Sequence, residues 1–358
     1  MIYRMHDLTG RQTDEREYYH SIDIAKGICI LFVMIDHYTW TELERRMLLF
    51  PFWIKMAVPV FMIISGFVYA KSFEFVRINS IEGAYNSRNI LKKTIRYTVP
   101  FIMAYSLEEF IYYLSKGHVH SFEENLVYLI SGGYGPGSYY YPIMMQLVFF
   151  FPVVFFVIKK YDQKGLLICG IINCIYEILV FSYGMNEECY RLLVFRYTFL
   201  VAYGCFLAFG NSIRGPLINV CMLMCGIGYL YAIDYAMVPI IFPRYWKETC
   251  FIAILFVVPI IKPFILNSKR NRVLECVGKA SFNIYLVQMV WFKGSDIIYG
   301  YITSRGAQIG ISLIFCTLVG ILFYAIETPI TKRIKRVGMS LLDKHTKAIR
   351  KRSALPND

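Results

Sequence analysis

Long apolar stretches recur along the whole of this 358-residue chain. Each runs for roughly 17–22 residues, the length that an α-helix needs to cross the hydrocarbon core of a bilayer. Hydrophobic residues make up 57% of the sequence, above the share of roughly half that is usual in a soluble domain. The sequence therefore predicts an all-α protein that forms one polytopic membrane helix bundle, and not a string of soluble domains.

Ten stretches are predicted to be transmembrane helices, at about 22–40, 51–72, 95–115, 138–158, 165–183, 191–210, 216–234, 249–267, 280–299 and 307–326. Two shorter apolar stretches, 126–132 and 236–243, are expected to be interfacial or re-entrant. The first 20 residues are polar and the run behind them is long enough to span, so no cleavable signal peptide is expected. The predicted organisation is an N-terminal segment at 1–21, a transmembrane domain at 22–326 and a basic tail at 327–358.

Basic residues are concentrated in alternate loops and in the tail. They gather after the second, fourth and eighth predicted spans, whereas the loops on the other side hold one or two each. The positive-inside rule then places both termini in the cytosol of a multi-pass protein of the plasma membrane, and the even number of spans agrees. This distribution explains the net charge of +13 without a nucleic-acid partner. The stretch 331–352 is predicted to be a basic amphipathic surface helix that binds anionic membrane lipids.

The ten cysteines are scattered, mostly inside apolar stretches. They form no CxxC pair and no grouping with histidine at the spacing of metal ligands, so they are interpreted as small buried hydrophobic residues. We therefore expect neither a metal site nor a permanently bound cofactor.

Only one of the six histidines, His37, falls within a long apolar stretch. Lys26 lies eleven residues before it, so the two side chains share one face of a helix and are separated by ~16 Å along its axis. An ionisable residue inside a membrane span is costly and points to a functional site. The pair therefore indicates a cation near the cytosolic mouth and a base deeper in the membrane.

Further polar residues fall at two depths of the predicted bundle. Charged residues open two spans on the cytosolic side, with Asp23 and Lys26 on the first and Lys92, Lys93 and Arg96 on the third. The cations among them suit a phosphorylated ligand. Charges in the outer half should face an interior cavity and find partners there. The polar residues expected in that half are Glu108, Glu109, Glu177, Arg196 and, nearer the middle, Gln288.

Each of these residues also has an ordinary structural explanation. A buried histidine can simply hydrogen-bond to a neighbouring helix, and an arginine such as Arg196 more often pairs with a carboxylate than contacts a substrate. The partner of His37 is expected on another span, and the sequence does not rank Glu108, Glu109 and Glu177 for that role. Asp36 lies about 100° around the helix from His37 and should not orient it.

Several of these residues belong to motifs that resemble acyltransferase family 3, a family of bacterial membrane O-acyltransferases that modify cell-surface polysaccharides. Residues 21–28 (SIDIAKGI), followed by His37, resemble its first-span signature of an arginine, ten residues and a histidine. Lys26 takes the place of that arginine, which keeps the charge and loses the planar fork. Gln288 stands where many relatives carry a second histidine. Similar family segments occur at 59–67, 93–100, 278–286 and 327–329, whereas the fifth to eighth spans carry none.

The resemblance implies acyl transfer, most simply of acetyl, from cytosolic acetyl-CoA or another acyl-CoA to a hydroxyl of an extracytoplasmic or lipid-linked polysaccharide. His37 would be the general base, with an acyl-histidine intermediate as an alternative. Lys26, Lys93 and Arg96 would bind a CoA phosphate group. The pantetheine arm, on the order of 15–20 Å long, matches the distance from Lys26 to His37. Arg196 and Gln288 are candidate donors to the oxyanion.

Two other functions are weighed against acyl transfer. A transporter or polysaccharide export protein would use the same polar cavity to move a solute without changing it covalently. A lipid-linked glycan polymerase would need large extracytoplasmic loops, and the longest predicted outer connection, about 116–137, is modest. We see no internal repeat of the kind that many transporters carry.

Overall fold

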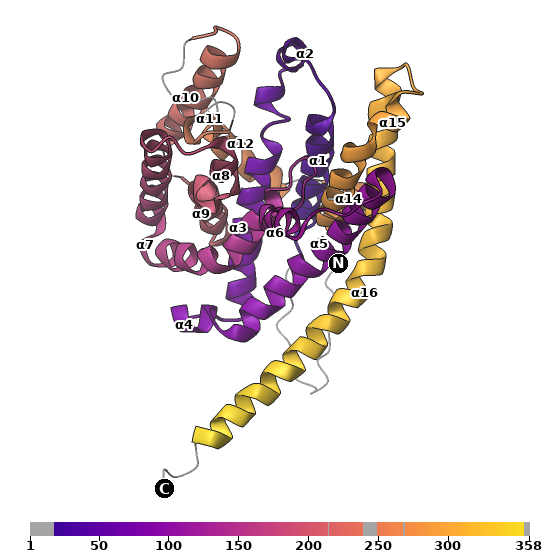
Figure 1. The fold of residues 1–358 in the computed structure, drawn as a ribbon. Coiled ribbons are helices and arrows are strands. Elements are labelled where there is room, and N and C mark those ends of the chain that lie inside the picture. Colours follow the sequence, from indigo (N-terminus) through magenta and orange to yellow (C-terminus); the bar gives the residue numbers. More distant parts are fainter. Residues whose placement is uncertain (1–17, 214, 239–248, 268, 354–358) are drawn as a thin grey trace.

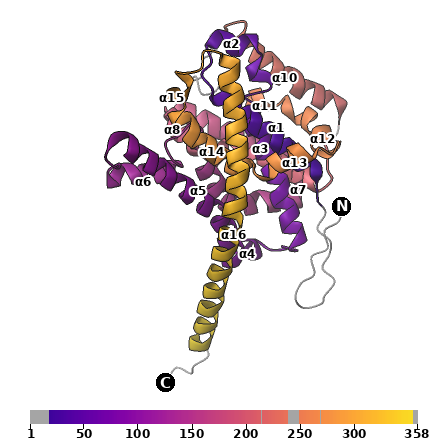
Figure 2. The same ribbon diagram turned by 90° about the vertical axis from the view of Figure 1, so that its right-hand side faces the viewer.

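The computed structural model describes residues 18–213, 215–238, 249–267 and 269–353. These residues form helices and loops, and no strand occurs among them, so the predicted all-α class is confirmed. Two predictions fall partly outside the described residues. These are the N-terminal segment 1–21, of which residues 1–17 lie outside, and the short apolar stretch 236–243, of which residues 239–243 lie outside. Figures 1 and 2 show the helices gathered into a bundle, from one end of which the C-terminal helix projects. We call this end of the bundle the tail end.

The helices follow one another in the order α1 (His20–His37), α2 (Glu42–Met47), η1 (Phe50–Phe52), α3 (Ala57–Phe75), α4 (Ile81–Ala84), α5 (Ser87–Lys116), α6 (Phe122–Ser131), α7 (Tyr140–Ser182), α8 (Glu187–Leu192), η2 (Val194–Tyr197), α9 (Thr198–Ala208), α10 (Pro216–Asp234), α11 (Phe251–Ile254), α12 (Val257–Asn267), α13 (Arg272–Lys279), α14 (Ser281–Gly294), α15 (Asp296–Tyr299) and α16 (Arg305–Ser353). Four helical segments of the described chain are long and apolar enough to cross a membrane, namely Phe50–Phe75, Tyr140–Ser182, Pro216–Asp234 and Arg305–Lys344. The number of ten spans and the cytosolic termini stay predictions.

Several predicted spans have different boundaries in the structure. The two spans predicted at 138–158 and 165–183 do correspond to two helical stretches, both within α7, that meet at a kink at Asp162, where the backbone leaves the helical region (φ 48°, ψ −121°). The Asn211 amide donates to the Asp162 carboxylate at 2.5 Å and holds this bend. The spans predicted at 191–210, 249–267 and 280–299 are each divided into shorter helices.

The C-terminal stretch 331–352 is helical, as predicted, and continues α16 without a break. Its binding to membrane lipids stays a prediction. The stretch packs on α5: a methyl group on Gly338 would lie 3.3 Å from Ile95 and 3.7 Å from Leu91. The side chain of Met339 is likewise buried. Pro329 lies inside the helix without ending it.

Two glycine pairs bring helices into close contact. Gly66 of α3 and Gly204 of α9 face each other, and a methyl group on either would overlap a carbonyl oxygen of the other helix. Gly27 of α1 and Gly278 of α13 make the same kind of reciprocal contact. Small residues at such crossings let membrane helices approach closely, as the Ser65-Gly66-Phe67 segment predicts. The second crossing fixes α1, which carries Lys26 and His37, against α13, directly before the start of α14.

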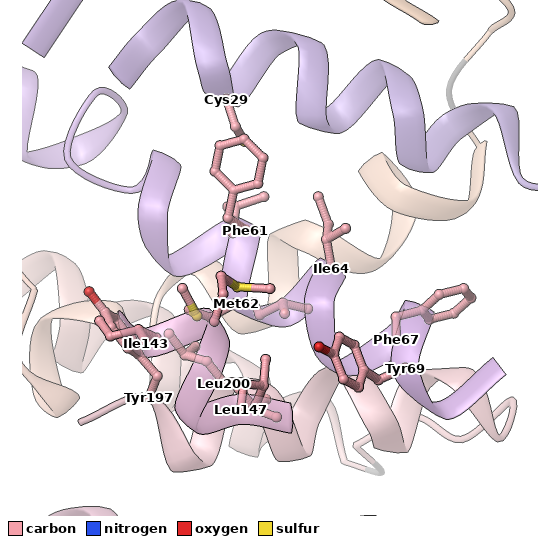
Figure 3. Packing of buried hydrophobic residues seen from close by; sticks show 14 of the residues in the cluster. Cys29, Phe61, Met62, Ile64, Phe67, Tyr69, Ile143, Leu147, Tyr197 and Leu200 are labelled. Atoms are coloured by element: carbon pink, nitrogen blue, oxygen red, sulfur yellow. The ribbon is translucent and has the colours of Figure 1, made fainter. Parts of the chain in front are cut away.

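The apolar core lies between α1, α3, α7 and α9. Figure 3 shows Phe61 of α3 extending toward Cys29 of α1, while Met62, Leu147 and Leu200 fill the space between α3, α7 and α9. These side chains are almost completely buried. The core therefore anchors α3 as a fixed wall beside α1, and this wall borders the site described next.

Candidate active site

His37 borders a small cavity beside the C-terminal half of α1 and the first turns of α14. Four parts of the chain line it: α1, α3, the loop before α7 and α14, through residues that include Phe61, Gly137 and Tyr285. The imidazole is half-buried, and the ring of Phe292 lies edge-on to it at 6.2 Å. One face of the histidine is thus packed by protein, while the other meets open space.

The hydrogen-bond partner of His37 is Gln288. Its Oε1 lies 2.7 Å from Nδ1 of His37, and its Nε2 donates to the carbonyl of Pro136 at 3.4 Å. Because an amide oxygen can only accept, Nδ1 must carry the proton, which leaves the lone pair on Nε2. Gln288 is completely buried. The partner does come from another helix, as expected, but it is an amide and not one of the three carboxylates considered.

A glycine leaves room for the reactive edge of the imidazole. A methyl group on Gly137 would lie 2.8 Å from Cε1 and 3.3 Å from Nε2 of His37, and the residue has a φ of +84°. The Tyr285 hydroxyl holds this loop by donating to the carbonyls of Gly137 (3.0 Å) and Ser138 (3.2 Å). The conformation and the close contact both require glycine here.

A second, larger cavity lies toward the tail end. Its polar wall is rich in cations, namely Lys26, Lys92, Lys93, Arg96, Lys279 and Lys335. No acidic side chain lines it among the described residues. Such a wall is suited to a polyanionic ligand.

The two cavities meet at a common wall. Phe61, Tyr140 and Phe282 line both, together with Ser281. The Phe61 ring lies between α3 and α1, as Figure 3 shows. The cation-lined cavity and the cavity beside His37 are therefore adjacent, with these four side chains between them.

The predicted cations are held in two different ways. Lys26 forms an ion pair with Asp23 at 3.0 Å, and Asp23 also accepts a hydrogen bond from the Tyr18 hydroxyl at 2.5 Å. Burial and the Asp23 carboxylate raise the pKa of Tyr18 above its usual range, so this hydroxyl stays a donor. Lys93 has its ammonium 3.9 Å from the ring centre of Tyr69 and 4.2 Å from that of Phe73.

Glu108 and Glu109 have other neighbours than His37. Glu108 is buried beneath the turn of Gly133 and Gly135, where added methyl groups would lie 2.9 Å from its carboxylate oxygens. Glu109 accepts a hydrogen bond from a different histidine, His120, at 2.9 Å. Consecutive residues on a helix point about 100° apart, so the two carboxylates serve different contacts.

Arg196 and Glu177 form a separate polar cluster beside α7 and α9. The guanidinium lies 4.6 Å and 4.7 Å from the ring centres of Tyr190 and Tyr197 and donates to Thr249 at 2.8 Å. Glu177 accepts the backbone N–H of Phe251 at 2.8 Å. Among the described residues that line the two cavities, neither Arg196 nor Glu177 occurs.

Some residues of the site have no signal in the sequence. Gly137 lies in a glycine-rich segment whose sequence indicates only a turn. Its contact with His37, seen in the structure, gives it a role. Tyr140 and Phe282 look like general aromatic residues of a membrane helix, yet they form the wall between the cavities. In the described part of the chain, no group of three His, Cys, Asp or Glu side chains could hold a metal ion.

The comparison with known families shows which family the chain belongs to. The model of the acyltransferase domain of acyltransferase family 3 matches residues 19–326. The chain therefore belongs to this family and is a membrane acyltransferase. No curated protein and no solved structure matches it.

Proposed function

We propose that this protein transfers an acyl group, most simply acetyl, from cytosolic acyl-CoA to a hydroxyl of an extracytoplasmic or lipid-linked polysaccharide at the plasma membrane. The observation that carries the proposal is the pair of adjoining cavities. One is lined by cations at the tail end, and the other contains His37. A donor with a charged head and a long thin arm fits this shape.

The donor is proposed to enter from the tail end, which the positive-inside rule assigns to the cytosol. Its phosphate groups would meet Lys93, Arg96 and Lys26, where charge-assisted hydrogen bonds are strong. The pantetheine arm would then pass the apolar wall of Phe61 and Phe282. Its length, on the order of 15–20 Å, is close to the ~16 Å of helix between Lys26 and His37.

The proposed chemistry starts from the free lone pair on Nε2 of His37. Nε2 accepts the proton of the sugar hydroxyl as the oxygen attacks the thioester carbonyl carbon. The carbon–oxygen bond forms, the carbon–sulfur bond breaks, and the imidazolium returns the proton to the CoA thiolate. Gln288 keeps the proton on Nδ1 throughout through its 2.7 Å contact. The products are an ester and free CoA.

The decisive experiment compares surface glycans from cells with and without the protein by mass spectrometry. We expect glycans from cells that contain it to be heavier by one acyl group, which also identifies that group. Glycans of unchanged mass would contradict the proposal. In purified protein, Lys26→Ala should chiefly raise the KM for acyl-CoA, and an unchanged KM would remove its assigned role.

The same protein in sealed vesicles tests transport. Acyl transfer predicts labelled product only when acyl-CoA is supplied. Uptake of a solute without acyl-CoA would favour the transporter or export function instead.

A further inference from the structure

The tail-end half of α16 is part of the wall of the cation-lined cavity. Close to the cavity, Glu327 of α16 accepts hydrogen bonds from Asn283 of α14 at 3.4 Å and from Thr331 one turn further on. Beyond them Gly338 packs against Ile95 and Leu91 of α5. These contacts fix both the rotation and the height of α16 beside α5.

This packing turns one lysine of α16 inward. Residues four apart lie on one helix face, so Lys335 shares the face of Glu327 and Thr331. Lys335 is half-buried and lines the cavity, whereas the neighbouring Lys332 and Arg336 are exposed. The basic tail therefore presents two classes of cation, one to the cavity and one to solvent.

The position of Lys335 is electrostatically unfavourable without a ligand. Arg96 and Lys92 lie close enough to repel its ammonium, and no described acidic side chain lines the cavity to compensate. Like charges that are partly removed from water cost free energy. A bound polyanion would turn this repulsion into attraction, and several cations around one cavity imply more than one phosphate group.

The height of Lys335 indicates which phosphate it meets. Lys335 lies beside both Arg96 and Lys92, and Lys92 is one helical turn nearer the tail end than Arg96. Lys26 lies near Arg96 and precedes His37 on α1, so the arm would lead inward from it. The phosphate furthest from the thioester in acyl-CoA is the 3′-phosphate of the adenosine.

We propose that Lys335 binds the 3′-phosphate of the CoA donor and makes the enzyme selective for CoA over 3′-dephospho-CoA. The inference rests on the proposed function. It assigns a substrate contact to a residue outside the family domain, whose match ends at residue 326. The domain alone would then lack part of its donor site.

The test measures binding, so that it does not depend on the acyl group or the acceptor. Equilibrium dialysis of the detergent-purified full-length protein gives the Kd of CoA and of 3′-dephospho-CoA. We expect wild-type protein to bind CoA about tenfold more tightly than 3′-dephospho-CoA, and Lys335→Gln to abolish this preference by weakening CoA binding alone. Lys332→Gln, which removes the same charge from an exposed face, is the matched control and should behave as wild type.

The outcomes separate the inference from the proposed function. If wild-type protein binds neither nucleotide, the proposed donor is wrong, and with it the inference. If wild-type protein binds CoA and Lys335→Gln leaves both Kd values unchanged, as it would if this lysine bound a lipid headgroup, only the inference is overturned. Equal weakening of both nucleotides would also overturn it. Gel filtration checks that each variant is folded, and Lys335→Arg should retain the preference for CoA.

Discussion

Two buried polar clusters of this protein differ in what surrounds their central side chain. One is centred on His37, the proposed proton acceptor, and the other on the cation Arg196. His37 has one partner, Gln288, and its remaining edge meets a cavity. Arg196 lies between the rings of Tyr190 and Tyr197 and donates to Thr249. Arg196 retains only 5% of its exposure. Both clusters place costly groups inside a membrane bundle.

Burial alone therefore does not identify a catalytic group. A buried charge is functional when part of it is left facing a space that a substrate can reach, and it is structural when its neighbours enclose it. For His37 the glycine at position 137 keeps that space open. For Arg196 two aromatic rings close it. Turnover per folded molecule separates the two cases, because a structural group affects the amount of folded protein and a catalytic group affects the rate.

The largest loss is expected for His37→Ala. Removing the proposed general base should lower turnover by roughly 10²–10⁴-fold, while the protein stays inserted and abundant. The matched control is His118→Ala, because His118 is exposed. Transfer rates from labelled acetyl-CoA, divided by the amount of folded protein, measure the effect. Normal acylation by His37→Ala would refute the assignment of the base.

A loss of about 100-fold is expected for Gly137→Ala, because misplacing a reacting group by ~1 Å can cost that much. The added methyl group would lie 2.8 Å from the imidazole and must displace it. Gly117→Ala is a sharp control, since Gly117 also has positive φ (+75°) and nothing lies within 4 Å of an added methyl group. Similar losses in the two variants would mean that backbone strain, and not the cavity, causes the effect.

The sequence predicted the residues on α1 better than their partners on other helices. The phase and spacing of Lys26 and His37 follow from helix geometry, and the structure places each beside one of two adjoining cavities. The class of fold follows from apolar length and is confirmed. These features are local, so a single stretch of sequence contains the information.

The remaining features depend on contacts between distant segments. Gln288 lies 251 residues from His37 along the chain, and its amide gave no reason to prefer it over three carboxylates. Glu109 is a carboxylate that could have been the partner of His37, but its position on α5 brings it to His120 instead. Hydrophobic pattern carries no signal for either of these.

A moderate loss, about tenfold, is expected for Gln288→Leu. The variant removes the acceptor that keeps the proton on Nδ1, and a lost hydrogen bond of ~1.4 kcal/mol corresponds to a factor of ten in rate. Gln288→His restores an acceptor nitrogen and should recover part of the turnover. The control is Gln146→Leu, which breaks buried contacts to Leu192 and Val194 instead. That control should lower the amount of folded protein and leave turnover unchanged.

The smallest effect on turnover, and the largest on stability, is expected for Arg196→Met. Methionine keeps much of the apolar stem between Tyr190 and Tyr197 but leaves Glu177 without the nearby charge. Breaking a buried charge arrangement by removing one member costs about 3–5 kcal/mol, so the unfolding temperature in detergent should fall. Turnover per folded molecule should stay within about twofold, since a group that contacts no substrate contributes nothing to the barrier. Loss of turnover at an unchanged unfolding temperature would reverse the comparison, because Arg196 would then act in catalysis despite its enclosure.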